Sequence, residues 1–357
     1  MIISASYKTD IPAFYGEWLI NRLRAGWCQM VNPYGRQVYT VNLRLVGASG
    51  GRLDDAGREG VEGIVFWTKY VGPFVKHLAE VHERGYPFVV QHTINGYPRE
   101  LEARVADYPR IVAAVHEIAA EYGPQAVVWR YDPILFTSLT PLDWHVEHFG
   151  ALAEQLAGAT REVVISFAQI YQKTRRNMES AARSEGFDWS MHEATTYPED
   201  PTDDRARGLV AKLADIAREH GMRLTVCAQE RFVIPGLAEA ARCIDATWFG
   251  GEYVRHGNRK ECACSASRDI GEYDTCPHGC VYCYAVRNRP LALARYRRHD
   301  PTSTFLFEPD FPTIQVRPRQ RARMPTGEGP ASRTPARCKK KAAAHHDAVA
   351  MPLFDLP

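Results

Sequence analysis

The chain has 357 residues, 45% of them hydrophobic, which is enough to bury the core of one barrel-sized domain. Its first residues, MIISASYKTD, have neither the basic nor the apolar region of a signal peptide. No run approaches the roughly 18 apolar residues of a membrane span. These features predict a cytoplasmic protein with no membrane partner. In that reducing compartment, nine cysteines favour metal binding, catalysis or burial over a disulfide framework.

The net charge of +2 is unevenly distributed along the chain. Residues 317–341 contain nine arginines and lysines and one acid, Glu328, so this segment carries +8 and the remainder carries −6. The folded body is therefore mildly acidic, and basic character is confined to a tail. This distribution excludes a general affinity of the whole protein for nucleic acid.

Short β-rich runs alternate with helical patterns along the chain. Asp10 is expected to cap a first helix, with Pro12 near its first position and Gly26 at its end. Strands are predicted at 2–6, 64–68, 88–93, 126–130, 163–167, 224–227 and 244–248, with an additional hairpin-like strand at 37–46. Further helices are predicted near 71–85, 108–122, 142–157 and 204–219.

The predicted strands are continuously apolar, as expected when both faces of a parallel sheet are buried. Strand–helix repetition over this length indicates an α/β fold, specifically a partial or permuted TIM-like (β/α) barrel. We expect one barrel domain at 1–310, including a cysteine-rich loop at 260–285. From 311 to 357, Pro, Arg, Ala, Gly and Ser dominate, which predicts a disordered basic tail that ends in a short apolar peptide.

Several predicted strands end in polar residues. In α/β barrels the chemistry occurs at the carboxyl ends of the strands, so Lys69, Arg130 and Asp132 are the candidate catalytic residues. Arg130 and Asp132 flank Tyr131 directly after an apolar run, and charges in a barrel interior require partners. The alternative is that these strand ends are polar because they reach solvent.

Three cysteines, Cys276, Cys280 and Cys283, form a C-x3-C-x2-C array within eight residues. Thiolates are soft ligands that suit zinc or iron–sulfur clusters. Three thiolates on a [4Fe–4S] cluster leave one iron open to a substrate or cofactor. The alternative is a closed structural zinc site that also uses Cys262 and Cys264.

The stretch CPHGCVYC, residues 276–283, resembles the signature of radical SAM enzymes, with Tyr282 in the aromatic position. The following Tyr284-Ala285 resembles the version found in relatives of spore photoproduct lyase. The chain as a whole resembles a little-characterised bacterial family of unknown function in which the triad lies near the C-terminal end. That resemblance rests on TDIPAF (9–14), FWTK (66–69), WRYDPI (129–134), CAC (262–264), DIGEY (269–273) and the triad.

The resemblance implies that Cys276, Cys280 and Cys283 hold a [4Fe–4S] cluster whose open iron binds S-adenosylmethionine, with Tyr282 near the adenine. It implies reductive cleavage of that cofactor to a 5′-deoxyadenosyl radical, with flavodoxin or ferredoxin as electron donor. In the superfamily the triad normally follows the first strand. Here it follows the last predicted strand, 244–248, so we expect that strand to fill the first position of a permuted barrel.

Gly250, Gly251 and Glu252 resemble the Gly-Gly-Glu motif that contacts the methionyl amine in many radical SAM enzymes. That motif normally follows the triad, whereas here it precedes it. The alternative is an ordinary Gly-Gly turn.

Cys262 and Cys264 suggest an auxiliary cluster or small metal site, to which Cys227 could contribute a ligand from the mouth of the barrel. Two [4Fe–4S] clusters would give about eight irons per chain. Cys28 and Cys243 are expected in the core or at the far side of the barrel. The alternative is that Cys262 and Cys264 are spare loop thiols.

The tail leaves two further hypotheses open. Its basic residues could attract nucleic-acid phosphates, and residues 350–357 faintly resemble sliding-clamp-binding peptides without their usual glutamine. The alternative functions are therefore a DNA repair or nucleic-acid modification enzyme of the spore photoproduct lyase type, and a non-catalytic, zinc- or cluster-stabilised nucleic-acid-binding protein.

Overall fold

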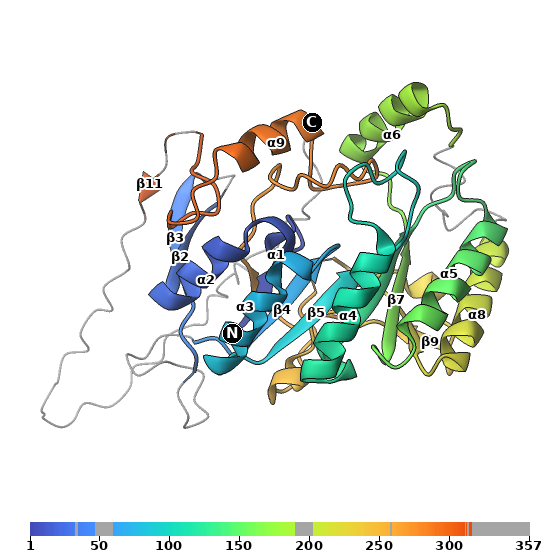
Figure 1. Cartoon of the computed structure of the whole chain (residues 1–357), viewed down its shortest axis with the longest axis horizontal. Helices are drawn as coiled ribbons and strands as arrows, with labels where there is room; N and C mark the ends of the chain where they lie inside the picture. Colours follow the sequence, from blue (N-terminus) through green and yellow to red (C-terminus); the bar gives the residue numbers. More distant parts are fainter. Residues whose placement is uncertain are drawn as a thin grey trace, which may run out of the picture.

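A computed structural model describes residues 1–32, 35–46, 60–189, 203–257, 259–310, 312 and 314–315 (Figure 1). Within these residues the main sheet has eight strands in the order β10-β1-β4-β5-β6-β7-β8-β9, and every ladder in it is parallel. Its strands are β1 (Ile2–Ala5), β4 (Gly63–Thr68), β5 (Phe88–Thr93), β6 (Val127–Ile134), β7 (Glu162–Phe167), β8 (Arg223–Val226), β9 (Ala238–Ala240) and β10 (Ser267–Asp269). The predicted α/β class is confirmed.

Helices follow most of these strands along the chain. Their bounds are α1 (Ile11–Phe14), α2 (Gly16–Ala25), α3 (Val75–Glu83), α4 (Tyr108–Tyr122), α5 (Leu142–Leu156), α6 (Gln172–Glu185), α8 (Asp203–Glu219) and α9 (Arg289–Arg297), with 3-10 turns η1 (Gly72–Phe74), η2 (Pro124–Ala126), η3 (Glu230–Phe232) and η4 (Ala246–Phe249). A small second sheet contains β2 (Trp27–Val31), β3 (Gln37–Asn42) and β11 (Ile314–Gln315). Figure 1 shows α6 and α9 along the same, upper side of the molecule.

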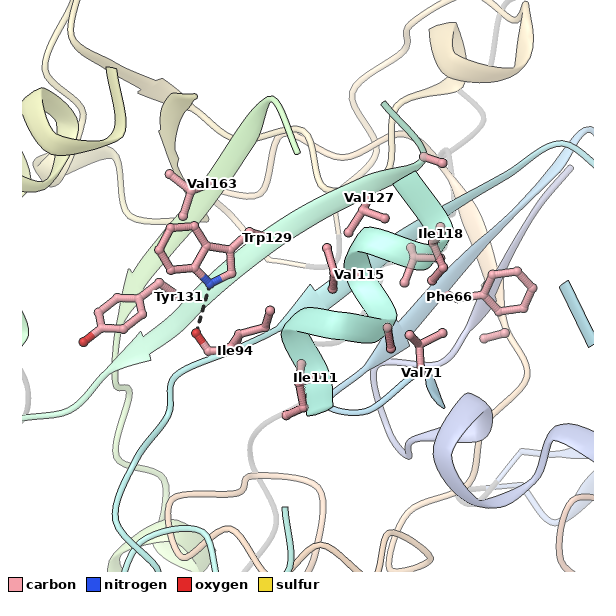
Figure 2. Packing of buried hydrophobic residues seen from close by; sticks show 14 of the residues in the cluster. Phe66, Val71, Ile94, Ile111, Val115, Ile118, Val127, Trp129, Tyr131 and Val163 are labelled. Atoms are coloured by element: carbon pink, nitrogen blue, oxygen red, sulfur yellow. Dashed lines mark hydrogen bonds between the residues drawn. The ribbon is translucent and has the colours of Figure 1, made fainter. Parts of the chain in front are cut away.

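The helix-covered face of the sheet carries the larger part of the core. Alternate residues of β6, among them Val127 and Trp129, point to this face and pack against α4 (Figure 2). The Trp129 indole donates to the carbonyl of Ile94 at 2.9 Å and stacks on Phe149 with ring centroids 4.7 Å apart. A fully buried tryptophan thus has both its ring and its N–H satisfied.

The opposite face of the sheet is also buried, and a chain segment rather than helices covers it. Apolar side chains of five neighbouring strands line this face: Ile2, Val65, Val89, Val128 and Val164. They pack against Ala241, Ile244 and cysteines from residues 243–264. The prediction of strands buried on both faces is therefore confirmed.

The predicted strand at 244–248 is wrong. This segment instead contains η4, whose N-cap residue Asp245 accepts a hydrogen bond from the Thr247 amide, and which ends at Gly250 in the left-handed conformation. A side chain that bonds the local backbone competes with strand pairing. β1 pairs with β4 on one side and with β10 on the other, and the loop that follows β10 carries the cysteine triad.

Asp269, at the end of β10, joins that strand to β1. Its carboxylate accepts from the hydroxyls of Ser4 and Ser6, both at 2.9 Å, and from the Gly271 amide at 2.9 Å. Gly271 approaches β1 so closely that a Cβ there would lie 1.9 Å from Ser6 Oγ. The edge of the sheet that precedes the triad is therefore closely packed.

Gly271→Ala is expected to lower the free energy of unfolding by about 1–3 kcal/mol, because the added methyl overlaps the serine that Asp269 binds. Urea denaturation would measure the change. Gly208→Ala in α8 is the matched control, because its Cβ would meet nothing within 4 Å, and it should be neutral or stabilising. Equal effects at both positions would contradict the close-packing argument.

His92 is fully buried at the end of β5, where its Nε2 accepts the Val71 amide at 3.2 Å. Burial lowers the pKa of His92 to about 4. The pKa of His92 is lower in the folded state than in the unfolded state. Burial of neutral His92 therefore gives its full contribution to folding stability above about pH 6.5, and this contribution is lost as the pH falls toward 4. The free energy of unfolding falls between about pH 7 and pH 4, and we expect this fall to be about 3 kcal/mol smaller in His92→Gln than in the wild type. Unfolding curves across that range test this, and an unchanged slope would contradict it.

Two predictions concern the ends of the described region. Ile314 and Gln315 pair with β3, beyond the predicted domain end at 310. The other residues of the predicted tail, including its basic run and terminal peptide, lie outside the described residues except for 312. None of the described helices is long and apolar enough to cross a membrane.

Candidate active site

A cavity of about 310 Å³ lies at the carboxyl ends of the main-sheet strands. Residues at the ends of β1, β4, β5, β6, β7 and β8 contribute to its wall, as does the triad loop. The structure brings to it these predicted site residues: Lys69, Arg130, Asp132, Cys262, Cys264, Cys276, Cys280, Tyr282 and Cys283.

The triad loop is held in place from two sides. On one side the Tyr15 hydroxyl donates to the carbonyl of Thr275 at 2.6 Å. On the other side, the loop bonds to the segment that follows β5. The Val281 amide donates to the carbonyl of Leu101, and the Arg104 amide donates to the carbonyl of His278. These hydrogen bonds place the three cysteines beside the cavity.

Burial raises the pKa of each triad thiol, Cys276, Cys280 and Cys283, above its ordinary value. The neighbouring Lys69 opposes this effect at Cys280. The thiols are therefore neutral in the protein alone, and a metal that binds them must displace their protons. As the side chains are placed, no group of three or more His, Cys, Asp or Glu among the described residues is arranged to hold a single metal ion.

Asp10 connects the triad loop to β4. Its Oδ2 accepts the Lys69 amide at 2.7 Å and lies 2.7 Å from Nε2 of His278, between two triad cysteines. Its Oδ1 accepts the Ala13 amide, as expected of the predicted helix cap. Sequence patterns indicated the cap only, because the contact with His278 spans 268 residues.

Lys69 and Tyr282 meet at Glu102, a buried carboxylate that sequence analysis missed. Lys69 Nζ lies 2.7 Å from Glu102 Oε1, and the Tyr282 hydroxyl donates to the same oxygen. Asn95 donates to the Tyr282 oxygen at 3.1 Å. Burial has the largest single effect and lowers the pKa of Lys69, but Glu102, Cys280 and Asp132 together raise it by more, so the net pKa lies above its ordinary value. Lys69 is therefore a fixed cation beside Cys280.

Arg130 and Asp132 form an ion pair, and β6 extends beyond the predicted strand end at 130, so it contains both residues. Arg130 also donates to Gln91 Oε1 at 3.0 Å and to Cys243 Sγ at 3.0 Å. Asp132 accepts from the hydroxyl of Ser166 at the end of β7. The pair lines the cavity and has partners on both neighbouring strands, so solvent exposure does not explain its charges.

Four further cysteines meet on the same side of the sheet. Cys227, Cys262 and Cys264 line the cavity as predicted, and Cys243 lines it with them. Cys243 is buried in the core, as expected, but it also lines the cavity, because the loop after β9 returns across the sheet face beside Cys227. Cys28 is buried in the core, as expected.

The structure does not bring Gly250, Gly251 and Glu252 to the cavity. Their neighbour Phe249 packs on Gly63, at the amino end of β4, whereas the cavity lies at the carboxyl ends. Gly250 has φ +73° and closes η4, which is the role of a simple turn.

The fold and the cavity define an α/β protein with a parallel sheet whose strand ends enclose a pocket lined by thiols and charged groups. The chain belongs to the family described as a domain of unknown function (DUF1848), whose model matches residues 2–285. That match runs from β1 to the alanine that ends the triad loop and includes all seven cysteines that line the cavity. Comparison with curated proteins gives no match.

Proposed function

We propose that this protein is a radical SAM enzyme in which Cys276, Cys280 and Cys283 hold a [4Fe–4S] cluster. The observation that carries the proposal is the position of the C-x3-C-x2-C loop, which directly follows β10 at the edge of a parallel sheet. All three thiols line one cavity at the carboxyl ends of the strands. The open edges of the sheet, β9 and β10, agree with a partial, permuted barrel.

The residues present fit such a cluster and its cofactor. The donor set is three soft thiolates, which leaves one coordination position for another ligand. Two buried polar atoms of cavity residues, Thr9 Oγ1 and His278 Nδ1, have no hydrogen-bond partner among the described residues. Buried polar atoms without partners are costly, and a polar cofactor would satisfy them.

When bound, the cluster supplies the electron that cleaves S-adenosylmethionine into methionine and a 5′-deoxyadenosyl radical, with flavodoxin or ferredoxin as the proposed donor. The protein's own task is to bind, orient and exclude water. Tyr282 keeps its phenol proton, because burial and Glu102 raise its pKa, and it is thereby held rigidly by a hydrogen bond to that carboxylate. Its position in the motif assigns it to the adenine.

Lys69, Arg130 and Asp132 are the proposed substrate-facing residues. Lys69 is protonated and paired, so it suits the binding of an anionic group better than proton abstraction. Arg130 and Asp132 form a further polar part of the cavity wall, where β6 and β7 end. A substrate with both hydrogen-bond donors and an anionic group fits this arrangement.

The proposal is tested by anaerobic purification, reconstitution with iron and sulfide, and EPR of the reduced protein with and without S-adenosylmethionine. We expect a [4Fe–4S] signal that shifts when the cofactor is added, and 5′-deoxyadenosine under reductant. Stoichiometric zinc with no cofactor cleavage would overturn the proposal and favour the metal-stabilised binding protein. Repair of DNA remains a prediction that depends on the tail.

A further inference from the structure

Cys227, Cys243, Cys262 and Cys264 form a second thiol cluster beside the triad. Cys227 directly follows β8 and Cys243 follows β9, whereas Cys262 and Cys264 lie in the loop that leads to β10. Three different parts of the chain thus deliver these thiols to one place. We refer to the four residues as the second cysteine set.

The sulfur atoms of the second cysteine set contact one another in series. Cys243 Sγ lies 3.5 Å from Cys227 Sγ. The Cys264 thiol interacts with the thiols of both Cys243 and Cys262. All four are free cysteines in the structure, so their proximity does not come from disulfide bonds.

The backbone around the second cysteine set is fixed by hydrogen bonds to the sheet and within the loop. The Cys227 amide donates to Ile165 at 2.8 Å, and the Ser265 amide donates to Ile244 at 2.8 Å. Arg255 donates to the carbonyl of Cys262 at 3.1 Å. These bonds fix the backbone that carries the thiols. As placed, the thiols do not surround a single ion, so binding a shared ligand requires them to rotate about χ1.

A buried cation contacts the second cysteine set, in which contacts between the thiols and burial hold the pKa values of Cys227, Cys243 and Cys264 above their ordinary value. Arg130 Nη1 donates to Cys243 Sγ at 3.0 Å, and Arg130 is only 4% exposed. A buried guanidinium offsets negative charge that would otherwise be costly to bury. Four thiolates around a divalent ion carry a net charge of about −2, and Arg130 reduces it further.

We propose that Cys227, Cys243, Cys262 and Cys264 bind a second metal centre, distinct from the triad, through four thiolates. Both a zinc ion and an iron–sulfur cluster take such a ligand set, and each thiol that binds releases one proton. In a tetrahedral zinc site with bonds of about 2.3 Å, neighbouring sulfurs lie about 3.8 Å apart, close to the separation of Cys227 and Cys243. Four protein ligands leave no coordination position free at this second centre. The proposed triad cluster, with three protein ligands, keeps one position free.

The test counts metals in full-length protein purified without oxygen, by mass spectrometry for zinc and iron and by assay of acid-labile sulfide. We expect Cys276→Ala/Cys280→Ala/Cys283→Ala to retain one zinc, or about four irons. Cys243→Ala/Cys264→Ala should lose that centre and keep the metal of the triad. Cys28→Ala is the control, because it removes a buried cysteine outside both sets, and it should keep both centres.

The proposal is overturned if Cys243→Ala/Cys264→Ala contains the same metals as Cys28→Ala, or if the triad variant holds none. A disulfide between Cys227 and Cys243 in the anaerobic protein would also overturn it.

Alkylation of the folded wild type provides a measurement that needs no variant. The second cysteine set should resist iodoacetamide until a chelator removes the metal. Loss of cofactor cleavage with this centre intact would count against the proposed function alone.

Discussion

Replacing Cys276, Cys280 or Cys283 singly with alanine is expected to reduce the formation of 5′-deoxyadenosine to below about one hundredth of wild type. Outer-shell changes alone cost metal sites about 10–100-fold, so the loss of a ligand should cost more. The three positions should behave alike, because all three thiols line the same cavity. Product analysis by liquid chromatography after reduction measures the effect.

Two comparisons make this result specific. Cys28→Ala should cleave the cofactor at the wild-type rate, because Cys28 lies in β2 and does not line the cavity. Circular dichroism should show that the triad variants remain folded, because hydrogen bonds from Tyr15 and Val281 hold the loop. A folded triad variant that retains cofactor cleavage would refute the assigned role of these cysteines.

Lys69→Met should lower the free energy of unfolding by about 3 kcal/mol. It leaves the carboxylate of Glu102, whose side chain is 3% exposed, buried without its cation. The side chain of Lys69 keeps 14% exposure, which places the expected loss at the low end of the range for a broken buried pair. Denaturant unfolding at neutral pH measures it.

A double variant separates the buried charge from the loss of contacts. Lys69→Met/Glu102→Gln replaces both charges with neutral groups of similar size, so it should recover most of the lost stability. The glutamine oxygen can still accept from the Tyr282 hydroxyl. Equal instability of the single and double variants would show that the charge of Glu102 does not cause the effect.

The central strands were predictable because burial on both faces leaves long apolar runs. The predicted ranges for β4, β5, β7 and β8 agree with the structure to within one residue at each end. β10 was not predicted, because three residues paired on one side give no periodic signal. α6 was missed for a related reason: it is mostly polar, and it buries only Thr174 and Met178.

The site was predictable where its residues are neighbours in sequence or end a strand. The triad, Lys69 and the Arg130–Asp132 pair meet that condition. Glu102 and Cys243 do not, because their roles depend on contacts with residues 180 and 113 positions away. Sequence patterns report local periodicity and spacing, and such distant contacts appear only once the sheet is assembled.

The pairing of β1 with β10 has a consequence for synthesis of the protein. Ser4 and its partner Asp269 are 265 residues apart, so β1 leaves the ribosome long before the strand that covers its edge. At about 5–20 residues per second, that delay is roughly 10 to 50 s. During it β1 presents an unpaired edge, which other chains can join. The triad emerges later still, so the proposed cluster would be inserted only after the last strand of the sheet has been made.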